Sequence, residues 1–177
     1  MERSRPSQPA DVAADVSALV RATIFVRDLD RAAAFYGALG LQEVYLDTVL
    51  DHPAASKLLG FAEHHAYPVK ILKRPGPNFG MVGLFQLDAR HEAVELAPAV
   101  GPARIGEVAL VFYVANLDRV MPRLIDAGAR WAPAPQRFEL GDLSTREVCM
   151  RDCDGTLINL IERDPAGQDR TTPDVAL

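Results

Sequence analysis

Among the polar residues in or beside apolar segments of the chain are Arg21, Gln86 and Asn159. A guanidinium group binds a carboxylate or enolate oxygen through paired hydrogen bonds. A side-chain amide offers both a donor and an acceptor, which together orient a ligand carbonyl or hydroxyl. Structural explanations are also open, since a strand-end arginine can pair with an acid and most buried amides bond to protein groups. The three residues therefore indicate either a site for ligand oxygens or ordinary bonding at strand ends.

The other reactive residue types do not form a recognisable catalytic or metal-binding pattern. His64 and His65 are adjacent, so on a strand they would point to opposite faces, and no third ligand is in register with them. Cys149 and Cys153 are separated by three residues, not by the two of a redox pair. We expect Cys149 to be buried on a strand and Cys153 to be exposed in a turn. No spacing singles out a general base among the acids considered, which are Glu43, Glu139, Asp142 and Glu147.

Composition excludes several classes of protein. With 177 residues, 49% of them hydrophobic, the chain can form one compact domain or two small packed modules. A net charge of −5 argues against a nucleic-acid surface, and the longest apolar run, residues 108–115, is far too short to span a membrane. We therefore expect no nucleic-acid or membrane partner. Two cysteines make no disulfide framework, so we expect the protein to be cytoplasmic.

A stretch in the first half of the chain recurs in the second half. Residues 26–31 read Val-Arg-Asp-Leu-Asp-Arg and residues 114–119 read Val-Ala-Asn-Leu-Asp-Arg, at an offset of 114 − 26 = 88. Gly40 and Gly128 follow at the same offset. A constant offset with identical residues indicates a duplicated structural unit.

The first copy reads as strand, helix, strand, strand, strand. In its first strand Arg21, Thr23 and Phe25 alternate with apolar residues, so they share one face. We expect Asp30 to cap the helix and Gly40 to end it. The four strands are predicted over residues 21–26, 41–46, 67–73 and 81–87.

The second copy repeats this order. Its first strand, over residues 108–114, is apolar throughout and is expected to be covered on both faces. A helix over 117–127, a proline-broken edge segment over 132–136, and a hairpin of strands 144–151 and 156–162 across an Asp-Gly turn complete it. The fold class predicted is α+β, with two tandem βαβββ units. We expect a mobile arm over 1–18 and one domain over 19–163, made of unit one (19–88), a linker (89–105) and unit two (106–163), with a polar tail over 164–177.

The motifs that carry this pattern resemble the vicinal-oxygen-chelate superfamily. They are Val-Arg-Asp-Leu-Asp-Arg at 26–31, Phe35-Tyr36, Leu39-Gly40-Leu41 and the hairpin Asp152-Cys-Asp-Gly155 with the strand after it. The superfamily includes glyoxalase I, ring-cleaving dioxygenases, methylmalonyl epimerases and bleomycin-resistance proteins. The resemblance implies a cupped mixed sheet with helices on its outer face and a ligand inside the cup.

Enzymes of this superfamily typically hold a divalent metal with two ligands from each unit. The resemblance places these positions at Arg21 and Ala109 on the first strands, and at Gln86 and Asn159 on the last strands. Arginine and alanine offer no lone pair, and two amides supply only neutral oxygens, so we predict no metal and no cofactor. Glu107 lies two residues before Ala109 and could reach a displaced metal site, which leaves a metal-dependent enzyme as the alternative.

By the same resemblance, the cup would be lined by residues of both units: Arg21, Thr23, Phe25, Gln86, Ala109, Tyr113 and Asn159. The partner expected is a small, partly apolar, anionic organic molecule. The protein would either sequester it, as a bleomycin-resistance protein does, or act on it as a metal-independent lyase or isomerase, with Arg21 stabilising an enolate-like charge. The alternative is a divalent-metal-dependent lyase, isomerase or dioxygenase with displaced ligands. A homodimer is expected, and residues 51–60 form a helix that is either a lid over the cup or packed against the sheet.

Overall fold

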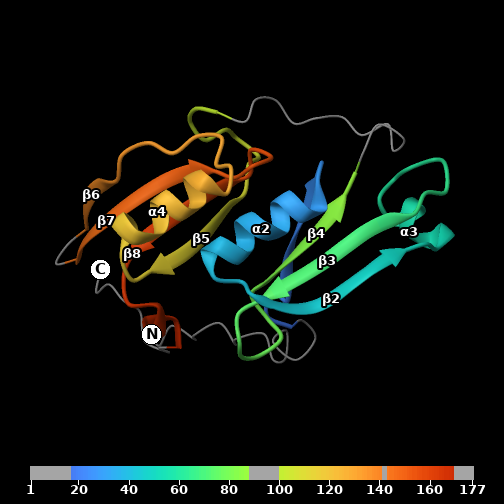
Figure 1. Cartoon of the computed structure of the whole chain (residues 1–177), viewed down its shortest axis with the longest axis horizontal. Coiled ribbons are helices and arrows are strands. Elements are labelled where there is room, and N and C mark those ends of the chain that lie inside the picture. Colours follow the sequence, from blue (N-terminus) through green and yellow to red (C-terminus); the bar gives the residue numbers. More distant parts are fainter. Residues whose placement is uncertain (1–16, 88–99, 141–142, 170–177) are drawn as a thin grey trace, which may run out of the picture.

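The computed structural model describes residues 17–87, 100–140 and 143–169, which form two four-stranded sheets and their helices (Figure 1). The first unit comprises β1 (Arg21–Val26), α2 (Leu29–Leu39), β2 (Glu43–Leu50), α3 (Pro53–Leu58), β3 (Tyr67–Lys73) and β4 (Met81–Gln86). The second comprises β5 (Ala109–Val114), α4 (Leu117–Asp126), β6 (Gln136–Leu140), β7 (Leu143–Arg151), β8 (Leu157–Glu162) and the 3-10 helix η2 (Pro165–Asp169). The prediction of two tandem βαβββ units in an α+β fold is confirmed.

The two sheets share one topology. Their strand orders are β1-β4-β3-β2 and β5-β8-β7-β6. The first and last strands of each unit pair in parallel, and the remaining neighbours pair antiparallel. Each unit therefore sets its first strand beside its last strand, as a repeat of one supersecondary motif should.

The helix caps follow the repeat, although not at the residue that we expected. Asp28, not Asp30, is the N-cap of α2, and its Oδ1 accepts a 2.9 Å hydrogen bond from the backbone N–H of Arg31. Asn116 caps α4 in the same way through Arg119. Gly40 ends α2 with a φ of 113°, a left-handed conformation that glycine adopts at little cost.

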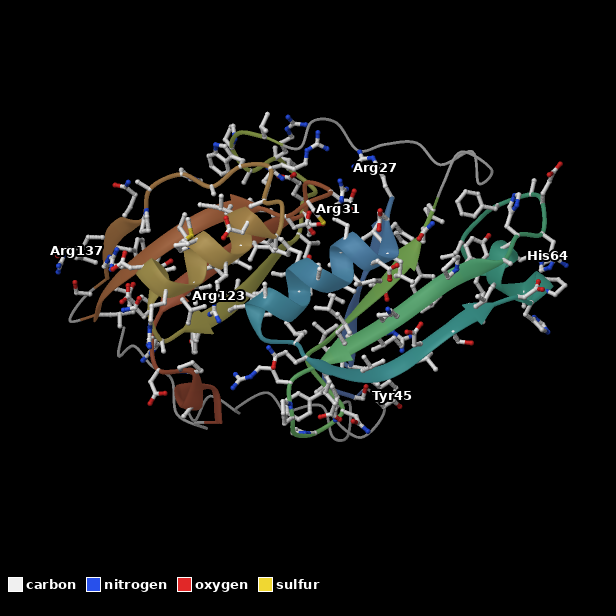
Figure 2. All side chains as sticks on the ribbon, viewed as in Figure 1. Arg27, Arg31, Tyr45, His64, Arg123 and Arg137 are labelled. Atoms are coloured by element: carbon white, nitrogen blue, oxygen red, sulfur yellow. The ribbon has the colours of Figure 1, made fainter. Side chains whose placement is uncertain are left out.

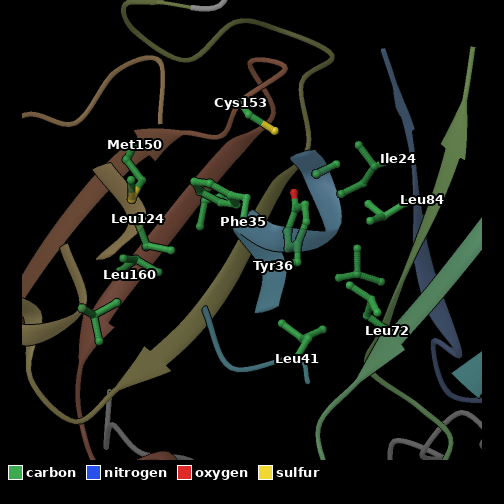
Figure 3. Close-up of a cluster of buried hydrophobic side chains, with 14 of the residues drawn as sticks. Ile24, Phe35, Tyr36, Leu41, Leu72, Leu84, Leu124, Met150, Cys153 and Leu160 are labelled. Atoms are coloured by element: carbon green, nitrogen blue, oxygen red, sulfur yellow. The ribbon is translucent and has the colours of Figure 1, made fainter. Parts of the chain in front are cut away.

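A hydrophobic core built from both units lies between the two sheets, and we call it the shared core (Figure 3). Figure 3 shows α2 in the middle, with Phe35 toward Leu124 and Leu160 of the second unit and Tyr36 toward Leu84 of the first. Helices α2 and α4 also contact each other. Each helix covers the core-facing side of its own sheet. The core-facing sides of the two sheets meet through these helices.

The opposite face of each sheet is turned away from the shared core. On β1, the buried Ile24 and Val26 alternate with the exposed Arg21, Thr23 and Phe25. We call this side of the first sheet the first open face. On β5 the same alternation exposes Ala109 and Val111 on what we call the second open face.

The expectation that the strand over 108–114 is covered on both faces was therefore wrong, since Val111 is 58% exposed. The proline-broken segment predicted over 132–136 was also misplaced. In the structure β6 begins just after Pro135 and forms the edge of the second sheet. The predicted arm over 1–18 and linker over 89–105 lie largely outside the described residues, and the predicted tail begins with η2.

A cluster of polar contacts fixes the two units against each other. Tyr36 donates a 2.8 Å hydrogen bond to Asp152 Oδ2, and both side chains are fully buried. Asp152 Oδ1 also accepts the backbone N–H groups of residues 154–156, which shapes the hairpin turn. Arg27 and Arg31 both contact Asp154 Oδ1, at 2.8 and 3.0 Å, at the junction of the units (Figure 2). The turn of the second unit is thereby anchored to α2 of the first.

The α3 insert packs on the first open face, at the end where β3 begins. Phe61 stacks on Tyr67 with ring centroids 6.3 Å apart, and Ser56 accepts hydrogen bonds from the Tyr67 hydroxyl and the His65 N–H. Of the two roles expected for residues 51–60, the structure shows packing against the sheet. His52 is the N-cap of α3. None of the helices in the described part of the chain is long and apolar enough to cross a membrane.

Candidate functional site

Arg21 is exposed, and its stem lies across Gly83 on the first open face. A Cβ placed on Gly83 of the adjacent strand would be 3.4 Å from Arg21 Cδ, 3.7 Å from Arg21 Nε and 3.5 Å from Thr23 Oγ1. Among the described residues, the Arg21 guanidinium has no hydrogen-bonding or ion-pair partner. The first open face thus holds a cation that can accept an external anion.

An aromatic pair lies on the same face, further along the strands. Phe25 and Phe85 face each other across β1 and β4 in an edge-to-face arrangement, with centroids 6.0 Å apart. Phe25 is 47% exposed. Beyond them, the α3 insert covers the fully buried Tyr67. Arg21, Thr23 and Phe25, which the sequence grouped together, therefore form one surface with a charged end and an aromatic end.

Gln86 is not part of this surface. It pairs with Val26, which is buried in the shared core, so both residues point toward α2. The Gln86 Oε1 accepts a 3.1 Å hydrogen bond from the backbone N–H of Leu29, the first residue of α2. Gln86 satisfies one of the open N–H groups at the helix start, and it faces away from Arg21.

The strand registers identify Gly83 as the first-unit equivalent of Asn159. Thr23 pairs with Gly83, and Val111, at the repeat position of Thr23, pairs with Asn159. The alternation of open-face and core-facing residues along β1 carries over to its parallel neighbour β4, and this was the signal that could have identified Gly83. Gly83 adjoins Arg21 on the first open face, and the sequence had given it no role.

The second open face is more polar. Asn159 donates a 3.3 Å hydrogen bond to Cys149 Sγ on the neighbouring strand, and Ala109 lies on the same face. Tyr113 is also on this face, where the Arg163 guanidinium lies 5.4 Å from its ring centroid. Glu147 adds a carboxylate, which accepts a 2.8 Å hydrogen bond from the Thr145 hydroxyl.

The environments expected for the two cysteines are reversed. Cys149 is exposed on the second open face, and Cys153 is buried in the hairpin turn. The turn is buried because it packs against α2 through the Tyr36–Asp152 contact. Burial, followed by the charges of Asp152 and Asp154, raises the pKa of the Cys153 thiol to about 12.

Glu107, the residue that could have served a displaced metal, is engaged elsewhere. Its two carboxylate oxygens accept hydrogen bonds from Arg151 at 2.7 and 3.0 Å. Arg151 is 1% exposed and also donates to the carbonyls of Gly101, Pro102 and Gly155. The hydrogen bonds from Arg151 lower the pKa of Glu107. The pair joins the segment before β5 to the end of β7.

The donor set at the four expected ligand positions does not fit a divalent metal. We expected Arg21, Gln86, Ala109 and Asn159, but the strand register puts Gly83 in place of Gln86. The corrected set supplies one neutral amide oxygen, that of Asn159. Elsewhere in the described part of the chain, no group of three His, Cys, Asp or Glu residues is arranged to hold a metal ion.

Arg21, Thr23 and Phe25 lie together on one sheet, and Ala109, Tyr113 and Asn159 lie together on the other. The two open faces point away from each other, because the opposite faces share one core. In the part of one chain that the structure describes, the two groups therefore lie on separate surfaces.

A family model for the glyoxalase/bleomycin resistance protein/dioxygenase superfamily matches residues 18–160. The chain belongs to this superfamily. The match begins before β1 and ends within β8, so it includes the hairpin turn between β7 and β8.

Several solved structures have the same fold. A glyoxalase family protein from Bacillus cereus superposes with a TM-score of 0.67 at 20% identity, over 82% of this chain and 95% of that one. The fosfomycin resistance protein FosX from Listeria monocytogenes gives a TM-score of 0.52 at 16% identity, over 84% and 92% of the two chains. A superfamily member from Sphaerobacter thermophilus gives 0.51 at 21% identity, over 84% and 99%. No curated protein sequence matches the chain.

Proposed function

We propose that this glyoxalase-superfamily protein binds a small, partly apolar, anionic organic molecule without a metal ion. The observation that carries the proposal is Arg21, which lies over Gly83 beside an aromatic pair and has no partner within the described chain. A guanidinium in this setting binds a carboxylate through two parallel hydrogen bonds, and an apolar surround weakens the competition from water.

The metal-free character of the site follows from residue chemistry. A cation at position 21 repels a second cation, and the three other positions together offer one amide oxygen. The test is metal analysis of the purified protein, followed by titration with Ni²⁺, Zn²⁺ and Fe²⁺. We expect no stoichiometric binding, and one tightly bound equivalent would contradict the proposal.

We further infer that the binding site is completed in a homodimer. Apolar side chains are exposed on both open faces, and contiguous apolar surface of this kind marks an interface. The faces are also complementary, since the first carries Arg21 and the second carries Glu147. In the dimer that we propose, the first open face of each chain lies opposite the second open face of its partner, which makes two equivalent cups. Light scattering coupled to size-exclusion chromatography should give the mass of a dimer.

Sequestration is the function that these features favour, because a shaped surface and a cation suffice for it. A metal-independent lyase or isomerase is the second candidate, supported by Glu147, a carboxylate on the second open face that could act as a general base. Mass spectrometry of small molecules released from the purified protein would supply the ligand, and incubation with that ligand would reveal turnover. Both cysteines are free thiols, which supports the expected cytoplasmic location.

A further inference from the structure

Gly83 occupies a position where the backbone does not require glycine. It lies in β4, a central strand between β1 and β3, and its φ is not in the left-handed region. Glycine weakens a strand interior, because it loses more conformational entropy on folding than other residues and has no side chain to pack. A glycine in such a place marks a close approach by another group. The reason for Gly83 therefore lies in the space above it.

That space is occupied by the stem of Arg21. The 3.4 Å between a Cβ at position 83 and Arg21 Cδ is already at the near edge of ordinary van der Waals contact. A side chain larger than alanine would enter the volume of the Arg21 methylene groups and lift the guanidinium off the sheet. Gly83 thus allows Arg21 to lie flat beside Thr23.

This placement fixes the distance between the charged and the aromatic parts of the face. Gly83 pairs with Thr23, and the Phe25–Phe85 pair follows two residues further along both strands. Two residues of strand span roughly 7 Å. A carboxylate bound at Arg21 would therefore have an attached ring system directed at the edge of the Phe25–Phe85 pair.

We propose that Gly83 is a specificity-determining residue, which positions Arg21 so that the first open face takes an aromatic carboxylate. The carboxylate lies at the start of β1 and the ring lies against Phe25 and Phe85. This inference rests on the proposed function, since it names the class and the orientation of the ligand for the same cup.

The experiment is calorimetric titration of the full-length protein with 2-naphthoate and with its neutral counterpart 2-naphthamide. Wild-type protein should bind the anion more tightly than the amide. Arg21→Met should weaken 2-naphthoate roughly 10- to 100-fold, the range for loss of a charged hydrogen bond, and leave 2-naphthamide unchanged. Gly83→Val should give the same pattern, because its branched side chain displaces Arg21, and Gly83→Ala should give a smaller loss in the same direction.

Gly37 in α2 supplies the matched control. Outside its two chain neighbours and the backbone of its own helix, no described atom lies within 4 Å of a Cβ placed there. Gly37→Val should therefore leave both affinities unchanged. Unchanged affinity of each variant for 2-naphthamide, together with its melting temperature, shows that the site is folded. If Gly83→Val fails to fold, Gly83→Ala decides the question with the same pair of ligands.

The outcomes separate the two proposals. If wild-type protein binds neither compound, the proposed function fails, and this inference fails with it. If both compounds bind but Gly83→Val and Gly83→Ala keep the full preference for the anion, Gly83 has no role in specificity, while the binding function stands. If Arg21→Met also keeps that preference, the anion is held elsewhere in the cup.

Discussion

The hydroxyl of Tyr36 donates a 2.8 Å hydrogen bond to Asp152, 116 positions later in the chain, and this contact joins the two repeat units inside the shared core. The contact lies among the apolar side chains that cover the inward faces of the two sheets. Burial and the nearby Asp152 charge raise the pKa of Tyr36 well above 10.0, so the phenol stays a donor at neutral pH.

Replacing Tyr36 with Phe should destabilise the protein by about 1–3 kcal/mol, because a buried carboxylate oxygen loses its donor. Urea denaturation at neutral pH measures the change. Tyr45→Phe is the matched control, since Tyr45 on β2 is 49% exposed and should change little (Figure 2). Equal stabilities of the two variants would show that the Tyr36–Asp152 bond adds nothing to the junction.

Stability should fall as the pH rises from 9 to 12, in part through Cys153. The thiol titrates near its ordinary value of 9.0 in the unfolded chain and near about 12 in the folded protein. The unfolded chain therefore loses its proton first, so the contribution of the thiol is complete below pH 9 and is lost through that window. The loss amounts to at most about 1.4 kcal/mol per pH unit, the slope for one proton.

Thermal melting across this pH range, with Cys153→Ala as the comparison, checks the sign. The variant should be less stable at neutral pH but should lose less stability above pH 9. Parallel curves for the two proteins would mean that Cys153 is not protected from ionisation in the folded state.

The two thiols should differ sharply in their accessibility. In the folded protein iodoacetamide should label Cys149, which is exposed, and should spare Cys153, which is 1% exposed. Peptide mass spectrometry before and after denaturation distinguishes the two sites. Prompt labelling of Cys153 in native protein would contradict the packing of the hairpin turn against α2.

The sequence predicted the local structure of the chain well, because the signals for it are local. Alternation in Arg21–Val26 and the turn after Lys73 bounded β1 and β3 correctly. Gly40 ended α2 as expected. The offset of the repeat placed α4 and β5. These elements follow from periodicity and caps, which act within a few residues.

The face to which each residue belongs was harder to predict. In β4 the residues from Met81 to Phe85 are apolar or glycine on both sides, so hydrophobicity alone could not separate Gly83 from Gln86. The two units also differ in length between first and last strand, so the repeat offset does not carry over from β1 and β5 to β4 and β8. The burial of Cys153 depended on the long-range contact of Tyr36 with the hairpin turn.

The arrangement of the open faces predicts that two defective variants restore each other when mixed. Arg21→Met disables the first open face, and Ala109→Trp fills the second with a bulky ring. In the proposed dimer, each cup combines the first face of one chain with the second face of its partner. A mixed dimer then holds one intact cup and one doubly altered cup, so 2-naphthoate binding should partly return after subunit exchange. Native mass spectrometry confirms that mixed dimers have formed.

Mixing Arg21→Met with Gly83→Val is the matched control, because both changes lie on the first open face and no intact cup can result. Failure of the Arg21→Met and Ala109→Trp mixture to bind, with mixed dimers present, would mean that the cup is not shared between chains.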